Sequence, residues 1–367
     1  MPATHLNGPV LVIGTGLLGA SIGLGLSRRG VRVLLSDTSP TAQAVAQDIG
    51  AGTILDAATA PSPELVVVAA PPDVTAAVVS GALRDHPGAT VVDIASVKSS
   101  ILAALRADPR LGPAELERYV GTHPMAGREK SGPAAARGEL FTAMPWVVCA
   151  LPESRTECRL AAESLAIDLG ATVSRMDAAE HDAAVALVSH FPQVASSLLA
   201  SRLLNAPAHA LALAGNGLRD TTRIAASDPR LWIQILSHNA PQIVPILHGL
   251  REDLNRLIAT LEDPTGPGAL LDLAELMGEG NAGQARIPGK HGAPPQAFAV
   301  VTVLVDDRPG QIARLLTEIG EIGVNLEDLR LDHSSGQNVG MVELSVLPNK
   351  HDLLIEALND RGWRVLQ

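Results

Sequence analysis

The first half of the chain alternates short apolar runs with stretches of helical periodicity. The runs lack polar alternation, which is typical of parallel strands buried on both faces. They lie at 9–13, 31–37, 65–69, 90–94, 145–149 and 171–174, and helical patterns lie at 20–30, 74–84 and 154–169. This order predicts an α/β Rossmann domain over residues 1–175.

The next hundred residues contain no strand pattern. Apolar positions recur there every three or four residues, which predicts an all-α domain over 176–280. Asp177 is expected to cap the first helix, with Glu180 completing a capping box. Pro192 lies inside that helix and is expected to kink it beside His190.

A segment dense in glycine and proline, 281–295, predicts a linker. Strand and helix patterns then follow in the order β-α-β-β-α-β, at 297–305, 310–323, 324–332, 339–347, 349–362 and 363–366. This order predicts a ferredoxin-like α+β domain over 296–367.

Composition and charge restrict the function classes. The chain has 367 residues, of which 46% are hydrophobic, enough for several buried cores. Its net charge of -11 and its 2% of aromatic residues argue against a nucleic-acid or anionic membrane surface. We expect no membrane-spanning run, no secretory leader, no metal site and a cytoplasmic location.

A glycine-rich turn follows the first predicted strand and opens the first predicted helix. It consists of Gly14, Thr15, Gly16, Leu17, Leu18 and Gly19. In this context the three glycines permit a tight turn, a close approach of pyrophosphate and close helix–strand packing. Asp37 ends the next strand, where its carboxylate would bind both ribose hydroxyls and repel a 2′-phosphate. The pattern predicts NAD and disfavours NADP.

Two further strands end at the same predicted sheet edge. Pro71 follows one of them, and Ser96 and Lys98 follow the other. Because such sheets bind ligands at their carboxyl edges, we expect Pro71 and Ser96 at the cofactor and Lys98 pointing into the same crevice. Alternatively, Ser96 caps the helix that begins near Lys98, and both roles are compatible.

The segment 121–132 holds His123 among glycines, a proline and charged or hydroxyl side chains that include Glu129. Its composition predicts a rigid loop that presents His123, and neither a helix nor a strand. A solvated surface turn is the alternative. Nearby in the helical domain, His190 is a site residue or a core histidine, and His181 is expected on a solvated or interface face.

Arg219 and Arg223 are spaced to share one face of a helix that Asn216 could cap. Two like charges there repel each other unless an anion or Asp220 offsets them. A solvated face is the alternative, but an acidic protein needs local positive charge to attract an anionic substrate. The pair therefore predicts a site for carboxylates.

The segments VIGTGLLGASIG, VVDIASVKSSI and THPMAGREKSG, followed by VSHFPQ and LRDTTRIAASDPRLW, resemble the prephenate/arogenate dehydrogenases of tyrosine biosynthesis. The resemblance runs from about Val10 to Leu261. It implies NAD-dependent oxidative decarboxylation of prephenate to 4-hydroxyphenylpyruvate and a helical dimerisation domain in a homodimer. It also implies that His123 is catalytic, that Ser96 supports it and that Arg223 binds the substrate. We expect Arg219, His190, Gln193 and Glu129 to contribute to the same substrate site.

Gln193 stands where some prephenate-using relatives carry a second histidine, so arogenate remains an alternative substrate. A dehydrogenase for β-hydroxy acids shares the same domain plan but has no need of the arginine pair. A sensor that binds NAD and an amino acid without turnover is a further alternative.

The C-terminal domain resembles an ACT domain, on Asp307-Arg308-Pro309-Gly310-Gln311-Ile312 and Gly323-Val324-Asn325-Leu326. Such domains bind amino acids between paired copies. The resemblance implies feedback by tyrosine, bound near Pro309, Gly310 and Asn325. A module that only stabilises the dimer is the alternative.

Overall fold

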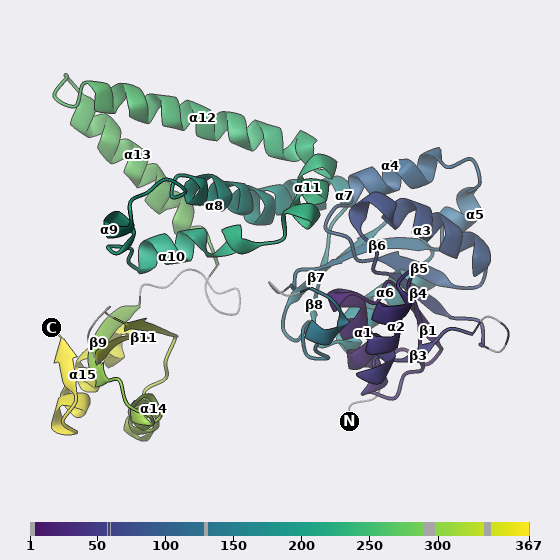
Figure 1. The fold of residues 1–367 in the computed structure, drawn as a ribbon, viewed down its shortest axis with the longest axis horizontal. Helices are drawn as coiled ribbons and strands as arrows, with labels where there is room; N and C mark the ends of the chain where they lie inside the picture. The colour runs from purple at the N-terminus through teal and green to yellow at the C-terminus, as the bar shows by residue number, and fades with distance from the viewer. Residues whose placement is uncertain are drawn as a thin grey trace. The chain divides into compact units, whose positions relative to one another are not determined.

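The computed structural model describes residues 4–56, 58, 60–127, 131–288, 298–333 and 339–366 (Figure 1). The chain forms two compact units, 1–250 and 251–367. The division falls inside the long helix α12 (Ala240–Glu262). The domain boundaries expected at 175 and 280 therefore stay predictions.

Within the described residues, one sheet organises the first unit, with the strand order β3-β2-β1-β4-β5-β6-β7-β8. All neighbouring pairs are parallel except β6 and β7. The strands are β1 (Val10–Ile13), β2 (Val33–Ser36), β3 (Thr53–Ile54), β4 (Leu65–Val68), β5 (Thr90–Asp93), β6 (Tyr119–Pro124), β7 (Pro145–Ala150) and β8 (Thr172–Arg175). This order confirms the predicted Rossmann domain and puts the topological switch point between β1 and β4.

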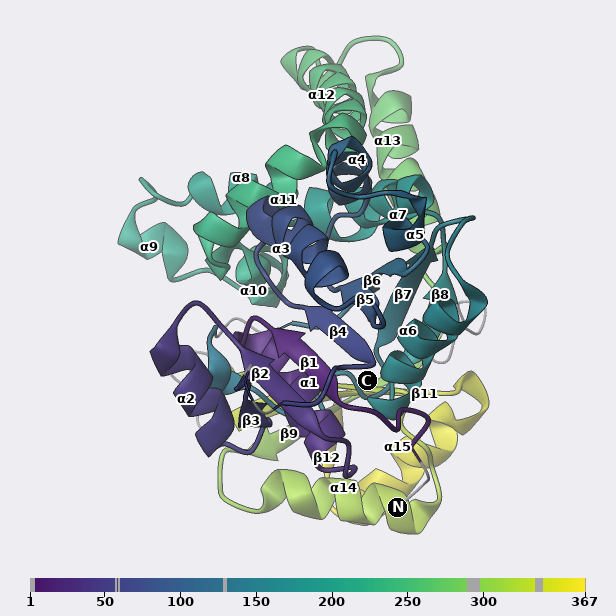
Figure 2. The same cartoon turned by 90° about the vertical axis from the view of Figure 1, so that its right-hand side faces the viewer.

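Helices cover both faces of this sheet (Figures 1 and 2). They are α1 (Leu17–Ser27), α2 (Pro40–Asp48), α3 (Pro72–Asp85), α4 (Ser99–Ala107), α5 (Pro113–Leu116) and α6 (Thr156–Asp168). Val10 and Val12 belong to one core cluster with α1, α2 and α6, whereas Leu11 belongs to a second cluster with α3 and α4. The central strands are thus buried on both sides, as their continuous apolar runs predict.

The rest of the first unit is helical, which confirms the second predicted domain type. Its elements are α7 (Ala178–Val185), a π turn (Ala186–His190), α8 (Phe191–Ser201), α9 (Ala208–Leu211), α10 (Asn216–Thr222), a 3-10 turn (Arg223–Ala226) and α11 (Pro229–His238). The Asp177 side chain caps α7 by accepting from the Glu180 N–H at 2.8 Å. The π turn precedes Pro192 and marks the expected irregularity beside His190.

The helical run Ala178–Ser201 has 24 residues and is long and apolar enough to cross a membrane. The expectation that no apolar run reaches this length is therefore wrong. The same run carries His181 and Asp182, whose side chains are buried in contacts with the Rossmann sheet and α4. These contacts attach the first turn of the helix to the rest of the first unit, and 28% of its apolar window is buried.

In the second unit, the part of α12 from residue 251 onward forms a helical hairpin with α13 (Ala269–Gln284). Arg256 bridges them through ion pairs to Asp272 at 2.5 Å, Glu279 at 3.2 Å and Glu275 at 3.4 Å. Helix α13 extends to Gln284, so the first residues of the predicted linker are helical.

The C-terminal part holds an antiparallel sheet with the order β10-β11-β9-β12. Its elements are β9 (Ala299–Asp306), α14 (Gln311–Ile322), β10 (Asp328–His333), β11 (Val339–Val346), a 3-10 turn (Pro348–Lys350), α15 (His351–Asp360) and β12 (Arg364–Leu366). The strands and α-helices follow one another in the predicted order, and apolar side chains from the sheet and both helices form a separate core.

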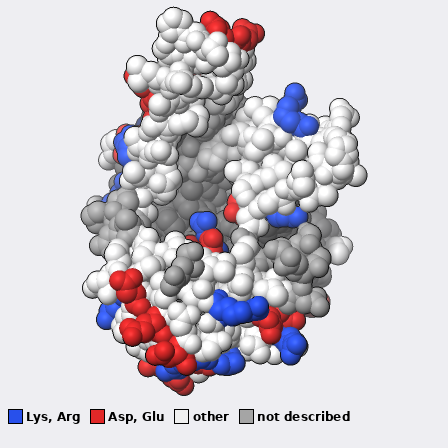
Figure 3. All heavy atoms as spheres, turned by 90° about the vertical axis from the view of Figure 1, so that its left-hand side faces the viewer, with Lys and Arg blue, Asp and Glu red and all other residues white. Residues whose placement is uncertain are grey.

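On the face drawn in Figure 3 most described side chains are neither acidic nor basic, and acidic side chains gather in a stripe at its lower left. A face of this kind is a poor match for a polyanion, in agreement with the net charge of -11.

Candidate active site

The turn between β1 and α1 needs glycine at two positions. Gly14 has a φ of +97°, and a Cβ on it would lie 2.4 Å from the Ala69 carbonyl oxygen. A Cβ on Gly19 would lie 1.9 Å from the Gly14 carbonyl oxygen. Gly16 differs, since its added Cβ would meet nothing within 4 Å. Gly14 and Gly19 therefore shape the turn, and Gly16 leaves open space before the N-terminus of α1, where a pyrophosphate fits.

Asp37 lies beside this turn and is held by it. Its Oδ2 accepts the Thr15 N–H at 2.5 Å and the Thr15 hydroxyl at 2.8 Å, while Oδ1 accepts the Ser39 N–H at 2.7 Å. Burial alone would raise the pKa of Asp37, but these hydrogen bonds outweigh it and lower the pKa. Thr15 is fully buried, so its side chain orients Asp37. The residues fit an adenosine ribose with free hydroxyls.

His123 lies on strand β6, paired with Val147 of β7, and is only 8% exposed. The expectation of a loop that presents His123 is therefore wrong. Gly121 permits the strand to form here, because a Cβ on it would lie 3.1 Å from both Lys98 Cδ and Tyr119 Oη. The chain leaves the strand after Pro124, and Glu129 lies outside the described residues.

A buried hydrogen-bonded series begins at His123. Its Nδ1 lies 2.9 Å from Nε2 of His181, whose Nδ1 lies 2.8 Å from Oδ1 of Asp182. The two rings meet edge to face, with centroids 5.1 Å apart. His181 is 0% exposed, so the expectation of a solvated or interface position is wrong. We refer to His123, His181 and Asp182 as the relay.

The relay is anchored at its acidic end. Asp182 accepts the backbone N–H groups of Lys98 and Ser99, each at 2.8 Å, at the first turn of α4. The Asn239 amide donates to the Asp182 carbonyl oxygen at 2.9 Å and lies 3.0 Å from Nδ1 of His190. Helix α7 is thereby joined to the end of the Rossmann sheet, and five polar side chains share one buried network: His123, His181, Asp182, Asn239 and His190.

The environment keeps the imidazoles of His123 and His190 neutral. Burial lowers the pKa of His123 well below its ordinary value, and the neighbouring His181, Lys98 and His190 lower it further. Burial also lowers the pKa of His190 to about 4, although Asp182 acts in the opposite direction. A neutral imidazole on His123 can accept a proton near neutral pH.

Lys98 does not point into an open crevice as expected. It is 1% exposed and forms an ion pair with Asp93, which also accepts the Tyr119 hydroxyl at 2.7 Å. Ser96 is half-buried in the loop between Asp93 and α4, and Pro71 is exposed at the start of α3. Lys98, and not Ser96, occupies the cap position of α4.

The helical part contributes a mostly apolar cavity of ≈ 280 Å³. Gln193, Ser227 and Trp232 line it with Val194, Ser197, Leu198, Ala225, Pro229, Ile233 and Leu236. The Ser227 hydroxyl donates to Gln193 Oε1 at 3.3 Å, and Trp232 meets the His190 ring edge to face at 6.0 Å. The cavity therefore adjoins His190, which connects it to the relay through Asn239.

The predicted arginine pair, Arg219 and Arg223, shortly precedes Ala225 of the cavity wall in the sequence. Helix α10 ends at Thr222, so Arg219 is helical and Arg223 begins the 3-10 turn that contributes Ala225 to the cavity wall. The expected cap is also shifted by one residue, because Gly215 takes the place predicted for Asn216. Both arginines are exposed, as a site for an incoming anion requires.

The sequence did not reveal His181, Asp182 and Asn239 as members of the site. The only visible signal for the first two is an adjacent His–Asp pair in an alanine-rich helix. The N–H donors to Asp182 at the start of α4 lie more than 80 residues away along the chain, and His123, which contacts His181, lies 58 residues away. Helical periodicity cannot reveal such a contact.

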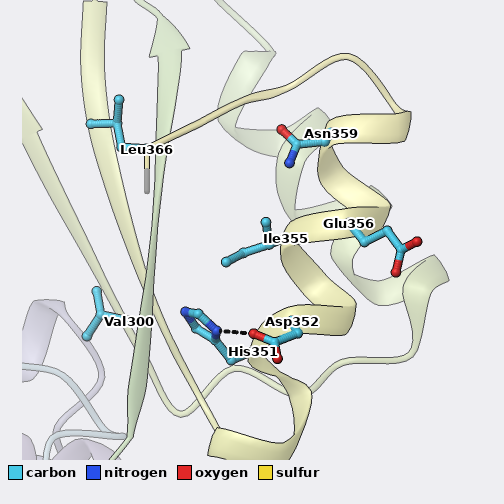
Figure 4. Close-up of a pocket in the computed structure, with 7 residues that line it drawn as sticks. All are labelled: Val300, His351, Asp352, Ile355, Glu356, Asn359 and Leu366. Carbon is cyan, nitrogen blue, oxygen red and sulfur yellow. Dashed lines mark hydrogen bonds and ion pairs between the residues drawn. The ribbon is translucent and has the colours of Figure 1, made fainter.

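In the C-terminal sheet domain, Pro309, Gly310 and Asn325 are exposed, with Gly310 at a φ of +89° before α14. A cavity of ≈ 590 Å³ lies elsewhere in this domain, between α15 and the strands β9 and β12 (Figure 4). Val300, His351, Asp352, Ile355, Glu356, Asn359 and Leu366 line it. It does not include the three residues predicted for an effector.

Comparisons with known proteins agree with this arrangement. Residues 22–175 match the family model "Prephenate dehydrogenase, nucleotide-binding domain", and residues 177–279 match "Prephenate dehydrogenase, dimerization domain". The probable prephenate dehydrogenase NovF of Streptomyces niveus is 37% identical over 96% of this chain and 98% of its own length. Prephenate dehydrogenase of Bacillus subtilis is 28% identical over 93% of this chain and 92% of its own.

A solved structure shares the fold of about three quarters of the chain. It is prephenate dehydrogenase from A. aeolicus in complex with hydroxyphenyl propionate and NAD+. The match covers 76% of this chain and 99% of that one, with 25% identity and a TM-score of 0.65.

Proposed function

This chain belongs to the prephenate dehydrogenase family, and from that premise we propose that it catalyses the NAD-dependent oxidative decarboxylation of prephenate to 4-hydroxyphenylpyruvate in the cytoplasm. The observation that carries the proposal is a neutral, almost fully buried His123 in a sheet domain whose glycine turn and Asp37 suit NAD. When bound, NAD supplies the hydride acceptor.

His123 accepts the proton of the ring hydroxyl group. At the same time, the ring carbon that carries this hydroxyl group is oxidised. The carboxylate leaves as carbon dioxide when the ring becomes aromatic, so the protein needs no separate decarboxylating group. Ser96 orients the hydroxyl at the sheet edge, and Pro71 contacts the cofactor. Orientation of the reacting groups contributes much of the rate enhancement.

Arg223 binds a carboxylate of the substrate, assisted by Arg219. We place the side chain of the substrate near His190 and Gln193, beside the helical cavity. Glu129 remains a predicted contact. Gln193 also supports a second candidate, arogenate, because a neutral amide tolerates the amino group of arogenate as well as the carbonyl of prephenate.

The direct test follows NADH absorbance with prephenate and with arogenate. We expect turnover with NAD and prephenate, with a kcat/KM for arogenate at least tenfold lower. A preference for arogenate would make the chain an arogenate dehydrogenase. If neither substrate is oxidised although NAD binds, the chain is a sensor and the proposed reaction is wrong.

The pH dependence of kcat/KM follows from the environment of His123. Only the neutral imidazole accepts a proton, so activity falls as the pH drops through the lowered pKa of His123. We therefore expect the acidic limb of the profile below the ordinary histidine value of about 6.5. Initial rates between pH 4.5 and 8 measure it, and a limb centred above 6.5 would contradict the assignment.

The glycine turn allows a paired test of cofactor binding. Gly16→Ala meets nothing within 4 Å, so it should leave the free energy of unfolding unchanged while raising KM for NAD roughly tenfold. Gly19→Ala clashes with the Gly14 carbonyl and should lower the free energy of unfolding by about 1–3 kcal/mol. Urea unfolding and NAD titration of both variants measure these effects. Equal losses of stability would contradict the distinction.

We propose a homodimer formed through the helical part. Large apolar side chains are exposed on α8, on α11 and around α9, including Leu198, Leu204, Leu213 and Ile233 at 55%, 83%, 85% and 68%. Exposure on this scale is typical of an interface. The match to a family dimerisation domain over 177–279 supports a second copy as the partner.

We propose that the C-terminal domain is a ferredoxin-like ACT domain that binds tyrosine near Pro309, Gly310 and Asn325. The order of its elements and strands supports this. If it is correct, a chain ending at Pro295 should keep turnover and lose tyrosine inhibition. Rates with increasing tyrosine test both chains, and unchanged inhibition of the shortened chain would place the inhibitor site elsewhere.

A further inference from the structure

The relay contains two side chains, His181 and Asp182, that have no part in the reaction as described above. Neither is exposed to an incoming substrate, since His181 is 0% and Asp182 is 2% exposed. His181 contacts Nδ1 of His123, and Asp182 contacts His123 through His181. We propose that His181 and Asp182 are positioning residues that determine which nitrogen of His123 carries its proton. The inference rests on the proposed function, because it concerns the base of that reaction.

The argument begins at Asp182. Its carboxylate accepts the Lys98 N–H on one oxygen and the Ser99 N–H on the other. Burial raises the pKa of Asp182, but the hydrogen bonds from His181, Ser99 and Lys98 outweigh burial and lower the pKa. The carboxylate is therefore ionised and can only accept hydrogen bonds. At 2.8 Å from Asp182, Nδ1 of His181 must carry a proton.

The proton positions then follow along the relay. In this proposal His181 is the neutral imidazole, with one donor and one acceptor nitrogen, so its Nε2 carries a lone pair. The 2.9 Å contact to Nε2 of His181 requires that His123 donate from Nδ1. Nε2 of His123 is left with its lone pair, ready to accept the hydroxyl proton. No proton has to pass along the relay for this to work.

The surroundings keep the relay in this state. Among the described residues, the charged and titratable groups that act on His123 are His181, Lys98 and His190, and all three oppose a positive charge on it. The Asp182 backbone is fixed by the Asn239 amide, and its carboxylate lies at the N-terminus of α4, where the helix dipole favours a negative charge.

The first test needs neither a variant nor turnover. Long-range proton–nitrogen correlation spectra of the protein labelled with [15N]histidine report the protonated nitrogen of each ring, and the His123→Asn spectrum assigns the His123 signals. We expect His123 and His181 both protonated at Nδ1 at pH 7.5. Protonation of His123 at Nε2 would overturn the inference. Failure of the prephenate assay would leave this result unaffected, so the two failures are distinguishable.

The second test compares His181→Phe with His181→Gln. The Gln carbonyl oxygen can accept from Nδ1 of His123, whereas Phe cannot. We expect His181→Phe to lower kcat on the order of 10²-fold and to leave KM for NAD unchanged. This loss is smaller than the ~10⁴-fold loss that a wrong histidine tautomer causes in a Ser-His-Asp triad. His181→Gln should keep most of kcat and shift the acidic limb of the pH profile upward, because one group that lowers the pKa of His123 is gone. Equal losses in the two variants would reduce His181 to a structural role.

The chain offers a matched control for the carboxylate. Asp168 is 4% exposed, accepts the N–H groups of His5 and Leu6 at 3.0 Å, and lies 2.8 Å from Nδ1 of His5. Asp168→Asn should therefore lose as much stability as Asp182→Asn and keep full kcat. Only Asp182→Asn should lower kcat, roughly tenfold or more. Equal kcat in the two variants would contradict the inference.

Discussion

Replacing His123 with asparagine should lower kcat on the order of 10³-fold and leave the affinity for NAD nearly unchanged. The loss follows from geometry. His123 is almost fully buried and presents a neutral ring whose Nδ1 is already bound to His181. Asparagine keeps a polar group that can donate to Nε2 of His181 but provides no base. The expected fall is therefore chemical, and the fold should survive.

Stopped-assay rates and a fluorescence titration with NAD measure the two quantities. His209 on α9 is exposed and serves as the control. His209→Asn makes the same substitution at a histidine that is not part of the relay. His209→Asn should keep wild-type kcat. An His123→Asn enzyme with full turnover would remove this imidazole from the mechanism, whatever the behaviour of the control.

The Rossmann sheet could be predicted because each of its central strands carries its own signal. Val10–Ile13 and Leu65–Val68 are apolar without alternation and become buried on both faces. Asp37 and the glycine turn could be predicted for the same reason, as their spacing reflects local geometry. The start of α11 at Pro229, capped by Asp228, is equally local.

Strand β6 could not be predicted, because its stability comes from neighbours distant in sequence. Gly121 and Pro124 both disfavour strands when judged by composition. In the fold, the missing side chain of Gly121 makes room for Lys98 and Tyr119, and Pro124 ends the strand opposite Trp146. A local reading therefore assigns a loop to the segment that holds the proposed base.

The relay was missed for a related reason. A His–Asp pair on a helix resembles a solvated pair unless donors for the carboxylate are known. Those donors are the backbone N–H groups of Lys98 and Ser99, which lie in the Rossmann part of the chain and not in the helical part. Burial of His181 is a property of the docked helix, and no periodicity within α7 encodes it.

Replacing Arg223 with alanine should raise KM for prephenate roughly 10- to 100-fold, with a smaller effect on kcat. A charge-assisted hydrogen bond contributes about 1.5–3 kcal/mol, and each 1.4 kcal/mol is about tenfold in affinity. Arg223 opens the 3-10 turn whose Ala225 lines the helical cavity, and we propose that its guanidinium binds a carboxylate that enters there. KM for NAD should not change, because Asp37 and the glycine turn lie on other elements.

Two neighbouring variants make this result specific. Arg223→Lys keeps the charge but loses the planar fork, and its KM should lie between wild type and Arg223→Ala. Arg219→Ala removes the same charge one helical turn earlier, on α10 itself, and should raise KM less than Arg223→Ala. If both alanine variants raise KM equally, and added salt removes the difference from wild type, the pair acts only as a general positive field. If Arg223→Ala leaves KM for prephenate unchanged, the carboxylate does not bind at this turn.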